Sequence, residues 1–156
     1  MVEERERSDM AEDTAKLSIL VDASPERVWD ALVDPVAIKK YFMGTTVKTD
    51  WKVGSPISWS GQWKEKPFSD KGEILEYEDS KVLSYSHWSP LTGADDRPEN
   101  YHVVTTTLHK TDGGTRVDLT QSNLAGGVSA ADRDSRADNE KNWTTVLEGL
   151  KVAVEG

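Results

Sequence analysis

The segment SAADRDSRADNEKNWTTVLEGLKVAVE (129–155) decides the fold, because it reads as one long helix whose apolar face must be buried. Ser129 can cap its start, and Asp132 and Asp134 favour the positive end of the helix dipole. The apolar residues recur at helical spacing: Trp143, Val146, Leu147, Leu150 and Val154. Toward the N-terminus the same face becomes polar: Glu140, Asn139, Arg136 and Asp132. We therefore expect the inward side to be apolar in its second half and polar in its first.

Seven β-strands are predicted ahead of this helix, in runs of β-branched and aromatic residues bounded by turn residues. They span 16–22, 45–48, 56–63, 72–77, 82–88, 101–110 and 115–122. Two short helices follow the first strand, since Ser24-Pro25 and Asp34-Pro35 each join an N-cap to a proline, and the second helix ends by Gly44. The sequence thus predicts an α+β fold in which the C-terminal helix closes over a seven-stranded antiparallel sheet.

The hairpin turns predict the register of the sheet. A turn centred on Asp79-Ser80 pairs Ile74 with Tyr85. A second turn, centred on Asp112-Gly113, pairs Leu108 with Val117, Thr106 with Leu119, and Val104 with Gln121. If the ends of the loop 89–100 match, His87 lies opposite His102. The same register points Glu76 inward, where an unpaired carboxylate is costly, so Glu76 needs a partner or the register is wrong there.

The polar end of the sheet meets the polar half of the long helix, since the loop 124–128 is too short to carry the helix elsewhere. We expect a cavity between them with an apolar floor and a polar mouth, which suits a small-molecule site. The predicted ligand-binding residues are Tyr85, His87, His102, Val104, Gln121, Asn123, Arg136, Asn139, Glu140, Trp143 and Leu147. The alternative is structural: Arg136 and Glu140 pair on a solvated helical turn, and Trp143 anchors the core.

His87 and His102 could bind a metal ion or transfer protons, because imidazole titrates near neutrality. A metal site needs further ligands, and His109 falls on the opposite face of the strand from His102. Histidine in a hydrogen-bonded row beside a pocket is the commoner situation. We therefore predict no metal ligand, no catalytic residue and no cofactor, and keep acid–base catalysis as an alternative.

Composition narrows the class of protein. The 156 residues fit one domain, at 15–156, after an acidic tail at 1–14 that is expected to be disordered. The absence of cysteine removes disulfides, iron–sulfur clusters and thiolate chemistry. A net charge of −9 argues against nucleic acid and membrane surfaces as partners. With neither a secretory signal nor a membrane-spanning run, the chain is expected in the cytoplasm.

Four strings, together with the order of elements, resemble a known superfamily. They are ASPERVWDALVDP (23–35), DKGEILEYED (70–79), PENYHVVT (98–105) and EKNWTTVLEGLK (140–151). The set is similar to the START-like (SRPBCC) superfamily, the helix-grip fold, and within it to bacterial single-domain relatives of the heat-shock-protein-90 ATPase activator. The resemblance implies a cavity between sheet and helix, which different members use for lipids, sterols, hormones or polyketides. It implies no single reaction and no shared catalytic set.

The first functional expectation is a binding module for a small apolar or amphipathic molecule. Its polar end faces His87, His102 and Arg136, and its apolar body lies toward Leu83, Val117 and Leu147. A second reading is a cyclase or dehydratase in which Tyr85 or a histidine moves protons on a carbonyl substrate. A third is an interaction protein, as a chaperone accessory or as a dimer through a strand edge. The chain is expected to be a monomer or a weak dimer. Eukaryotic activators carry a further N-terminal domain for the main chaperone contact, where this sequence has the acidic tail.

Overall fold

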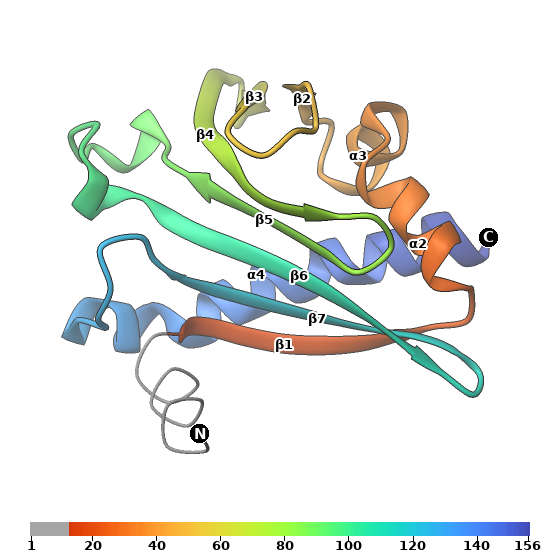
Figure 1. The fold of residues 1–156 in the computed structure, drawn as a ribbon. Coiled ribbons are helices and arrows are strands. Elements are labelled where there is room, and N and C mark those ends of the chain that lie inside the picture. The colour runs from red at the N-terminus through yellow and green to blue at the C-terminus, as the bar shows by residue number, and fades with distance from the viewer. Residues whose placement is uncertain (1–12) are drawn as a thin grey trace.

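In the computed structural model, which describes residues 13–156, one antiparallel sheet packs against one long helix (Figure 1). The strands are β1 (Asp13–Val21), β2 (Thr46–Thr49), β3 (Pro56–Trp63), β4 (Lys66–Glu78), β5 (Val82–His87), β6 (His102–Thr111) and β7 (Gly114–Asn123). The helices are α2 (Pro25–Leu32), α3 (Pro35–Tyr41) and α4 (Ala130–Glu155), with 3-10 turns η1 (Pro90–Thr92) and η2 (Pro98–Asn100). The strand order is β1-β7-β6-β5-β4-β3-β2. The predicted α+β fold, with two short helices between the first two strands, is confirmed.

The helices begin where their capping residues predict. The Ser24 hydroxyl accepts a hydrogen bond from the Arg27 N–H at 3.3 Å, and the Asp34 carboxylate accepts one from the Val36 N–H at 3.0 Å. Ser129 and Asp132 form a reciprocal capping box at the start of α4, with N···O distances of 3.1 and 2.8 Å. These side chains satisfy backbone donors that the first helical turn leaves unpaired.

The predicted register of the central strands is confirmed. Tyr85 pairs with Val104 and His87 with His102 between β5 and β6, and Leu108 pairs with Val117 between β6 and β7. The second half of α4 covers the apolar end of this face and buries four side chains: Val146, Leu147, Leu150 and Val154. Figure 1 shows α4 running along the sheet behind β6 and β7, with its C-terminal end near α2.

The inward orientation expected for Glu76 was wrong. The pairing of β4 with β5 shifts register between Ile74 and Glu76, so that Tyr77 comes to lie opposite Leu83 and Glu76 becomes exposed. The Tyr77 ring packs edge-on against Trp29, with ring centroids 5.2 Å apart. Burying an aromatic ring is favourable whereas burying an unpaired carboxylate is costly, which explains why the extra residue is accommodated at this point.

Two strand boundaries differ from those expected. β4 begins at Lys66, before the predicted start at residue 72, and this extension brings Asp70 into the sheet opposite Trp59 of β3. β1 begins at Asp13, and Thr14 is buried, so these two residues belong to the fold. The rest of the expected acidic tail, 1–12, lies outside the described residues.

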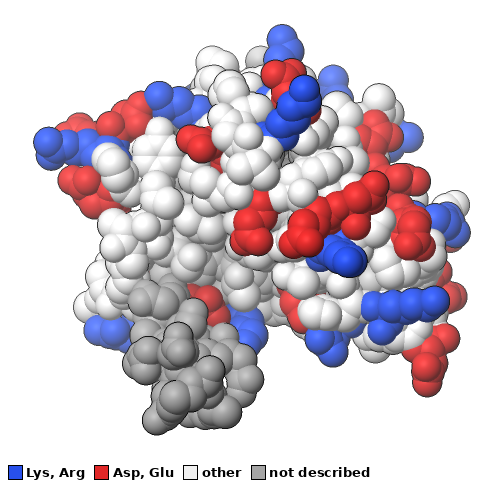
Figure 2. Space-filling view, viewed as in Figure 1, with Lys and Arg blue, Asp and Glu red and all other residues white. Residues whose placement is uncertain are grey.

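Charged side chains are dispersed over the surface that Figure 2 presents. Lys and Arg side chains are scattered on this face and do not gather into one basic patch, and acidic groups lie among them. Within residues 13–156, no helix combines the length and apolar character needed to cross a membrane.

Close packing of β4 against β5 depends on a glycine. A Cβ atom at position 72 would lie 1.7 Å from the Ser86 carbonyl oxygen, a distance that no real contact reaches. On either side the two strands are hydrogen-bonded, with the Trp88 N–H donating to the Lys71 carbonyl at 2.8 Å and the Glu73 N–H donating to the Ser86 hydroxyl at 3.0 Å. Any side chain at position 72 would therefore separate the strands.

We expect Gly72→Ala to lower the free energy of unfolding by about 2 kcal/mol or more, because the strands must move apart to admit the methyl group. Gly113→Ala is the matched control, since a Cβ at position 113 meets nothing within 4 Å. Urea denaturation followed by tryptophan fluorescence measures both. Equal stability of the two variants would show that the close approach is not required.

Candidate ligand-binding cavity

A cavity of about 540 Å³ lies between the first half of α4, the polar end of the sheet and the segment that follows α3. A volume of this size accommodates a small organic molecule. Its lining residues are Phe42, Met43, Thr45, Trp59, Gln62, Phe68, Asp70, Tyr85, His87, Leu91, Thr92, His102, Val104, Gln121, Asn139 and Trp143. The cavity therefore draws on the segment after α3, on α4 and η1, and on all the strands from β3 to β7.

Aromatic rings form a large part of the walls. The Trp59 ring lies between Tyr85 and His87, with centroid distances of 4.9 and 5.0 Å. On the helix side, Phe42 meets Trp143 edge-on at 5.8 Å. Below these rings a further void of about 50 Å³ is lined by apolar core residues, including the predicted Leu147. Four aromatic residues line both spaces and so mark the boundary between the cavity and the core: Phe42, Trp59, Tyr85 and Trp143.

A paired carboxylate and imidazole form the polar end of the cavity. The Nε2 atom of His87 lies 2.8 Å from the Oδ2 atom of Asp70, and a carboxylate can only accept, so Nε2–H donates. The second Asp70 oxygen, Oδ1, is buried and has no hydrogen-bond partner among the described residues. The His87 side chain is 30% exposed. Asp70 therefore orients His87 and directs its Nδ1 atom away from the carboxylate.

His102 also carries an unpaired nitrogen. Its Nδ1 atom is buried without a partner in the described part of the chain. Burial lowers the pKa of His102, as does the neighbouring His87, whereas a hydrogen bond with Asn123 and the charge of Asp132 act in the opposite direction. Since burial is the largest of these effects, the pKa of His102 is lowered and its neutral form is favoured.

Tyr85 contributes a protonated phenol. Burial raises the pKa of Tyr85 well above its ordinary value, since the phenolate would be poorly solvated. The Tyr85 hydroxyl makes no hydrogen bond to any of residues 13–156. A ligand in the cavity would therefore meet a neutral hydroxyl that can donate or accept.

Gln121 is already fully engaged by the protein. Its Oε1 atom accepts a hydrogen bond from the Trp143 indole at 2.8 Å, and its Nε2 atom donates to the Thr14 hydroxyl at 3.1 Å. This chain links β1, β7 and α4, and it fixes the orientation of the Trp143 ring. Gln121 thus lines the cavity but serves mainly to position Trp143.

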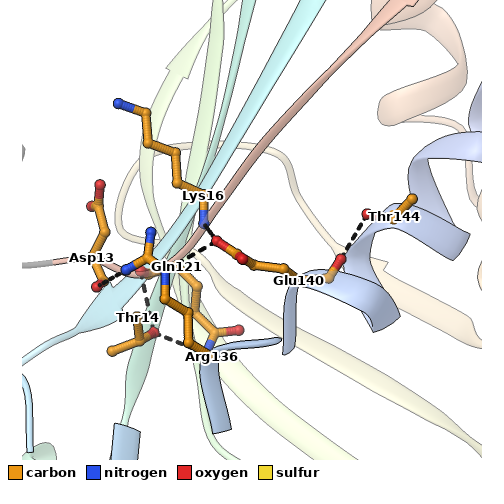
Figure 3. Close-up of polar contacts among 7 residues, drawn as sticks. All are labelled: Asp13, Thr14, Lys16, Gln121, Arg136, Glu140 and Thr144. Atoms are coloured by element: carbon orange, nitrogen blue, oxygen red, sulfur yellow. Dashed lines mark hydrogen bonds and ion pairs between the residues drawn. The ribbon is translucent and has the colours of Figure 1, made fainter. Parts of the chain in front are cut away.

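Four of the predicted ligand-binding residues do not line the cavity: Leu147 lines only the smaller void below it, and the other three are Asn123, Arg136 and Glu140. Figure 3 shows Arg136 and Glu140 turned toward β1, where the Arg136 guanidinium donates to the Asp13 carbonyl at 2.9 Å and the Glu140 carboxylate accepts from the Lys16 N–H at 2.9 Å. The two side chains also pair with each other at 3.1 Å. Asn123 instead supports the start of α4, donating to the Gly127 carbonyl and to Asp132. For Arg136 and Glu140 this agrees with the structural alternative, in which the two side chains pair with each other on the helix and bind no ligand.

Seven predicted residues do line the cavity: Tyr85, His87, His102, Val104, Gln121, Asn139 and Trp143. Asp70 was missed because the strand was expected to begin at residue 72. Its even spacing from Ile74, which the predicted register pairs with Tyr85, was a signal that could have found it. Trp59, Phe42 and Phe68 were also missed, since nothing in their local sequence shows that β3 and α3 curve back toward α4.

A larger hollow, of about 1050 Å³, lies beside β2, β3 and the η2 loop. Lys71 and Asp96 in its lining form an ion pair, and Asp96 also accepts a hydrogen bond from the Tyr101 hydroxyl at 2.6 Å. Because these charged groups already satisfy one another, we take the smaller aromatic cavity as the candidate site. In the described part of the chain, no three acidic or histidine side chains come together as a metal site would need.

A long helix closed over an antiparallel sheet, with an aromatic cavity between them, defines a START-like protein of the helix-grip fold. The family model described as activator of Hsp90 ATPase homolog 1-like protein matches residues 22–155. The chain belongs to this family.

Solved structures agree with this assignment. The protein ChR145 from Cytophaga hutchinsonii is 48% identical, with a TM-score of 0.73 over 90% of this chain and 92% of that one. MLL2253 from Mesorhizobium loti is 25% identical, with a TM-score of 0.70 over 90% and 95% of the two chains. The Aha1 dimer from Colwellia psychrerythraea shares the fold at 22% identity and a TM-score of 0.68, over 90% and 95%. No curated protein matches the chain.

We expect Glu140→Ala to lower the free energy of unfolding by about 1.5 kcal/mol, because the Lys16 N–H and Arg136 lose their shared acceptor. Glu148→Ala is the matched control, since Glu148 is exposed on the same helix and the substitution is identical. Chemical denaturation measures both. A loss at position 140 no larger than that at position 148 would contradict a role for Glu140 in holding β1.

We expect part of the acid sensitivity of the protein to come from His102. Its lowered pKa means that the unfolded chain binds more protons than the folded one below about pH 6.5, so stability falls as the pH drops through that value. His102→Gln should lose less stability than the wild type between about pH 7.5 and pH 5.5, measured by urea denaturation. His109→Gln, which leaves His102 in place, is the control. An unchanged loss in His102→Gln would refute this origin.

Proposed function

We propose that this protein binds a small, mostly apolar molecule with a polar end in the cavity between the sheet and α4. One observation carries the proposal: a cavity of about 540 Å³ has aromatic walls, and its lining includes polar atoms without partners on Asp70 and His102. Buried polar groups normally have hydrogen-bond partners, so orphaned ones beside a cavity are what a ligand site presents.

The walls suggest how such a molecule lies. Its apolar body packs against Trp59, Tyr85 and Trp143, whose rings are rigid and already in contact with neighbouring side chains. Its polar end lies toward His87 and His102, which face each other across β5 and β6. Arg136 has no part in this arrangement, because its guanidinium is held by Asp13 and Glu140. The resemblance to START-like proteins supports the same location, since members use this space for apolar molecules.

The Asp70–His87 pair favours a second candidate, an enzyme that moves protons on a carbonyl substrate. A carboxylate that fixes one imidazole nitrogen leaves the other to act as a general base, and the 2.8 Å contact has that geometry. Tyr85 would supply a neutral proton donor nearby. Deuterium uptake at the carbon beside the carbonyl of candidate ketones, measured by mass spectrometry, tests this activity. Uptake that His87→Gln leaves unchanged would remove His87 from it.

The description of the family and the dimeric relative raise chaperone binding and self-association as further possibilities. Pairing through the outer edge of β1 is not supported, because α4 side chains already occupy that edge. No other contact among residues 13–156 favours either possibility, so neither is proposed.

We expect protein freshly purified from its host to retain a small molecule in native mass spectra, and the emptied protein to bind the neutral apolar probe N-phenylnaphthylamine. Asn139→Trp places an indole in the cavity and should weaken probe binding by about tenfold or more. Ala137→Trp, on an exposed position two residues away, is the control and should bind as the wild type does. Equal probe affinity in the two variants would refute the location.

A further inference from the structure

The charged lining of the cavity is of one sign only. Among the described residues that line it, Asp70 is the sole acidic residue and none is lysine or arginine. The arginine expected at the mouth, Arg136, is ion-paired with Glu140 and bonded to β1. A carboxylate or phosphate ligand would therefore enter an aromatic space beside a like charge with no cation to offset it, which is electrostatically unfavourable.

The polar atoms without partners at the Asp70 end of the cavity are hydrogen-bond acceptors. Asp70 Oδ1 is a carboxylate oxygen without a partner. A neutral imidazole has one donor nitrogen and one acceptor nitrogen, and Nε2–H of His87 donates to Asp70, so Nδ1 is the acceptor in that form of the ring. His87 lines the cavity, and its side chain is partly exposed.

His102 also presents an acceptor nitrogen. Its Nδ1 atom has no partner among the described residues, so the interaction with Asn123 that acts on its pKa involves Nε2. The Asn123 amide nitrogen already donates to Gly127 and Asp132, which leaves the amide oxygen to accept from Nε2–H. Neutral His102 therefore also carries its lone pair on Nδ1. Three residues that line this end of the cavity, Asp70, His87 and His102, thus each carry a hydrogen-bond acceptor without a protein partner among residues 13–156.

We propose that the polar end of the ligand is a protonated amine on an apolar, ring-sized body. This assignment rests on the proposed function and specifies its ligand class. An ammonium group donates up to three hydrogen bonds, matches the three acceptors and offsets the charge of Asp70. Aromatic faces such as that of Trp59, which packs against His87, attract a cation further. Asp70 Oδ1 is covered in this structure, so the ammonium engages His87 Nδ1 and interacts with Asp70 through its charge.

Three matched compounds test the assignment by calorimetry at about pH 8, where free imidazole is neutral. Tryptamine, tryptophol and indolepropionate share an indole and a short chain, and they end in an ammonium, a hydroxyl and a carboxylate. Tryptamine should bind about tenfold more tightly than indolepropionate. Asp70→Asn should weaken tryptamine about tenfold and change tryptophol little. Asp50→Asn, at an exposed acidic residue outside this cavity, should leave all three unchanged.

The outcomes separate this inference from the proposed function. Equal or tighter binding of indolepropionate overturns the amine assignment, and so does an unchanged preference for tryptamine over tryptophol in Asp70→Asn. Failure of all three compounds to bind while N-phenylnaphthylamine still binds also overturns the assignment but leaves the cavity as an apolar site. Failure of the neutral probe as well would refute the proposed function itself.

Discussion

The fold depends on how α4 satisfies the outer edge of β1. An edge strand presents unpaired N–H and C=O groups, which must find partners or remain open to other chains. Four side chains of α4 supply partners along the length of β1 and just beyond it. Arg136 and Glu140 bind Asp13 and Lys16 at one end, and Lys151 and Glu155 bind the Leu20 carbonyl and the Asp22 N–H at the other, at 2.9 and 2.7 Å. The helix is thereby fixed in both position and direction over the sheet.

This attachment explains why a cavity forms under one half of the helix. Beyond Trp143 the inward side chains of α4 are apolar and buried, so helix and sheet close on each other. Before Trp143 the inward residue is Asn139, and the polar residues beside it are held by β1, so nothing large fills the space. The Trp143 indole, held by Gln121 and Thr14, separates the two regions. The cavity and the core both arise because the inward face of α4 is polar before Trp143 and apolar after it.

Much of this arrangement could be predicted from local patterns. Periodicity identified α4, capping residues identified where the helices begin, and matching the ends of the loop 89–100 placed His87 opposite His102. The prediction was wrong where contacts between residues distant in the sequence decide which side chains are buried. The register shift that exposes Glu76 depends on burying Tyr77 against Trp29. Arg136 and Asn139 lie on neighbouring stripes of α4, and helical spacing does not say which stripe faces the cavity and which faces β1. Placing Asp70 in the cavity required knowing that β4 begins at Lys66, which the sequence pattern did not show.

The central claim is that a ligand lies against the aromatic walls beneath α4, and the tryptophan indole N–H signals test it directly. Adding tryptamine to nitrogen-15-labelled protein should shift the Trp59 and Trp143 signals, because both rings line the cavity. The Trp88 signal should stay in place, since its indole lies outside the cavity and donates to the Ala94 carbonyl. Shifts at Trp88 with none at Trp59 and Trp143 would contradict the account.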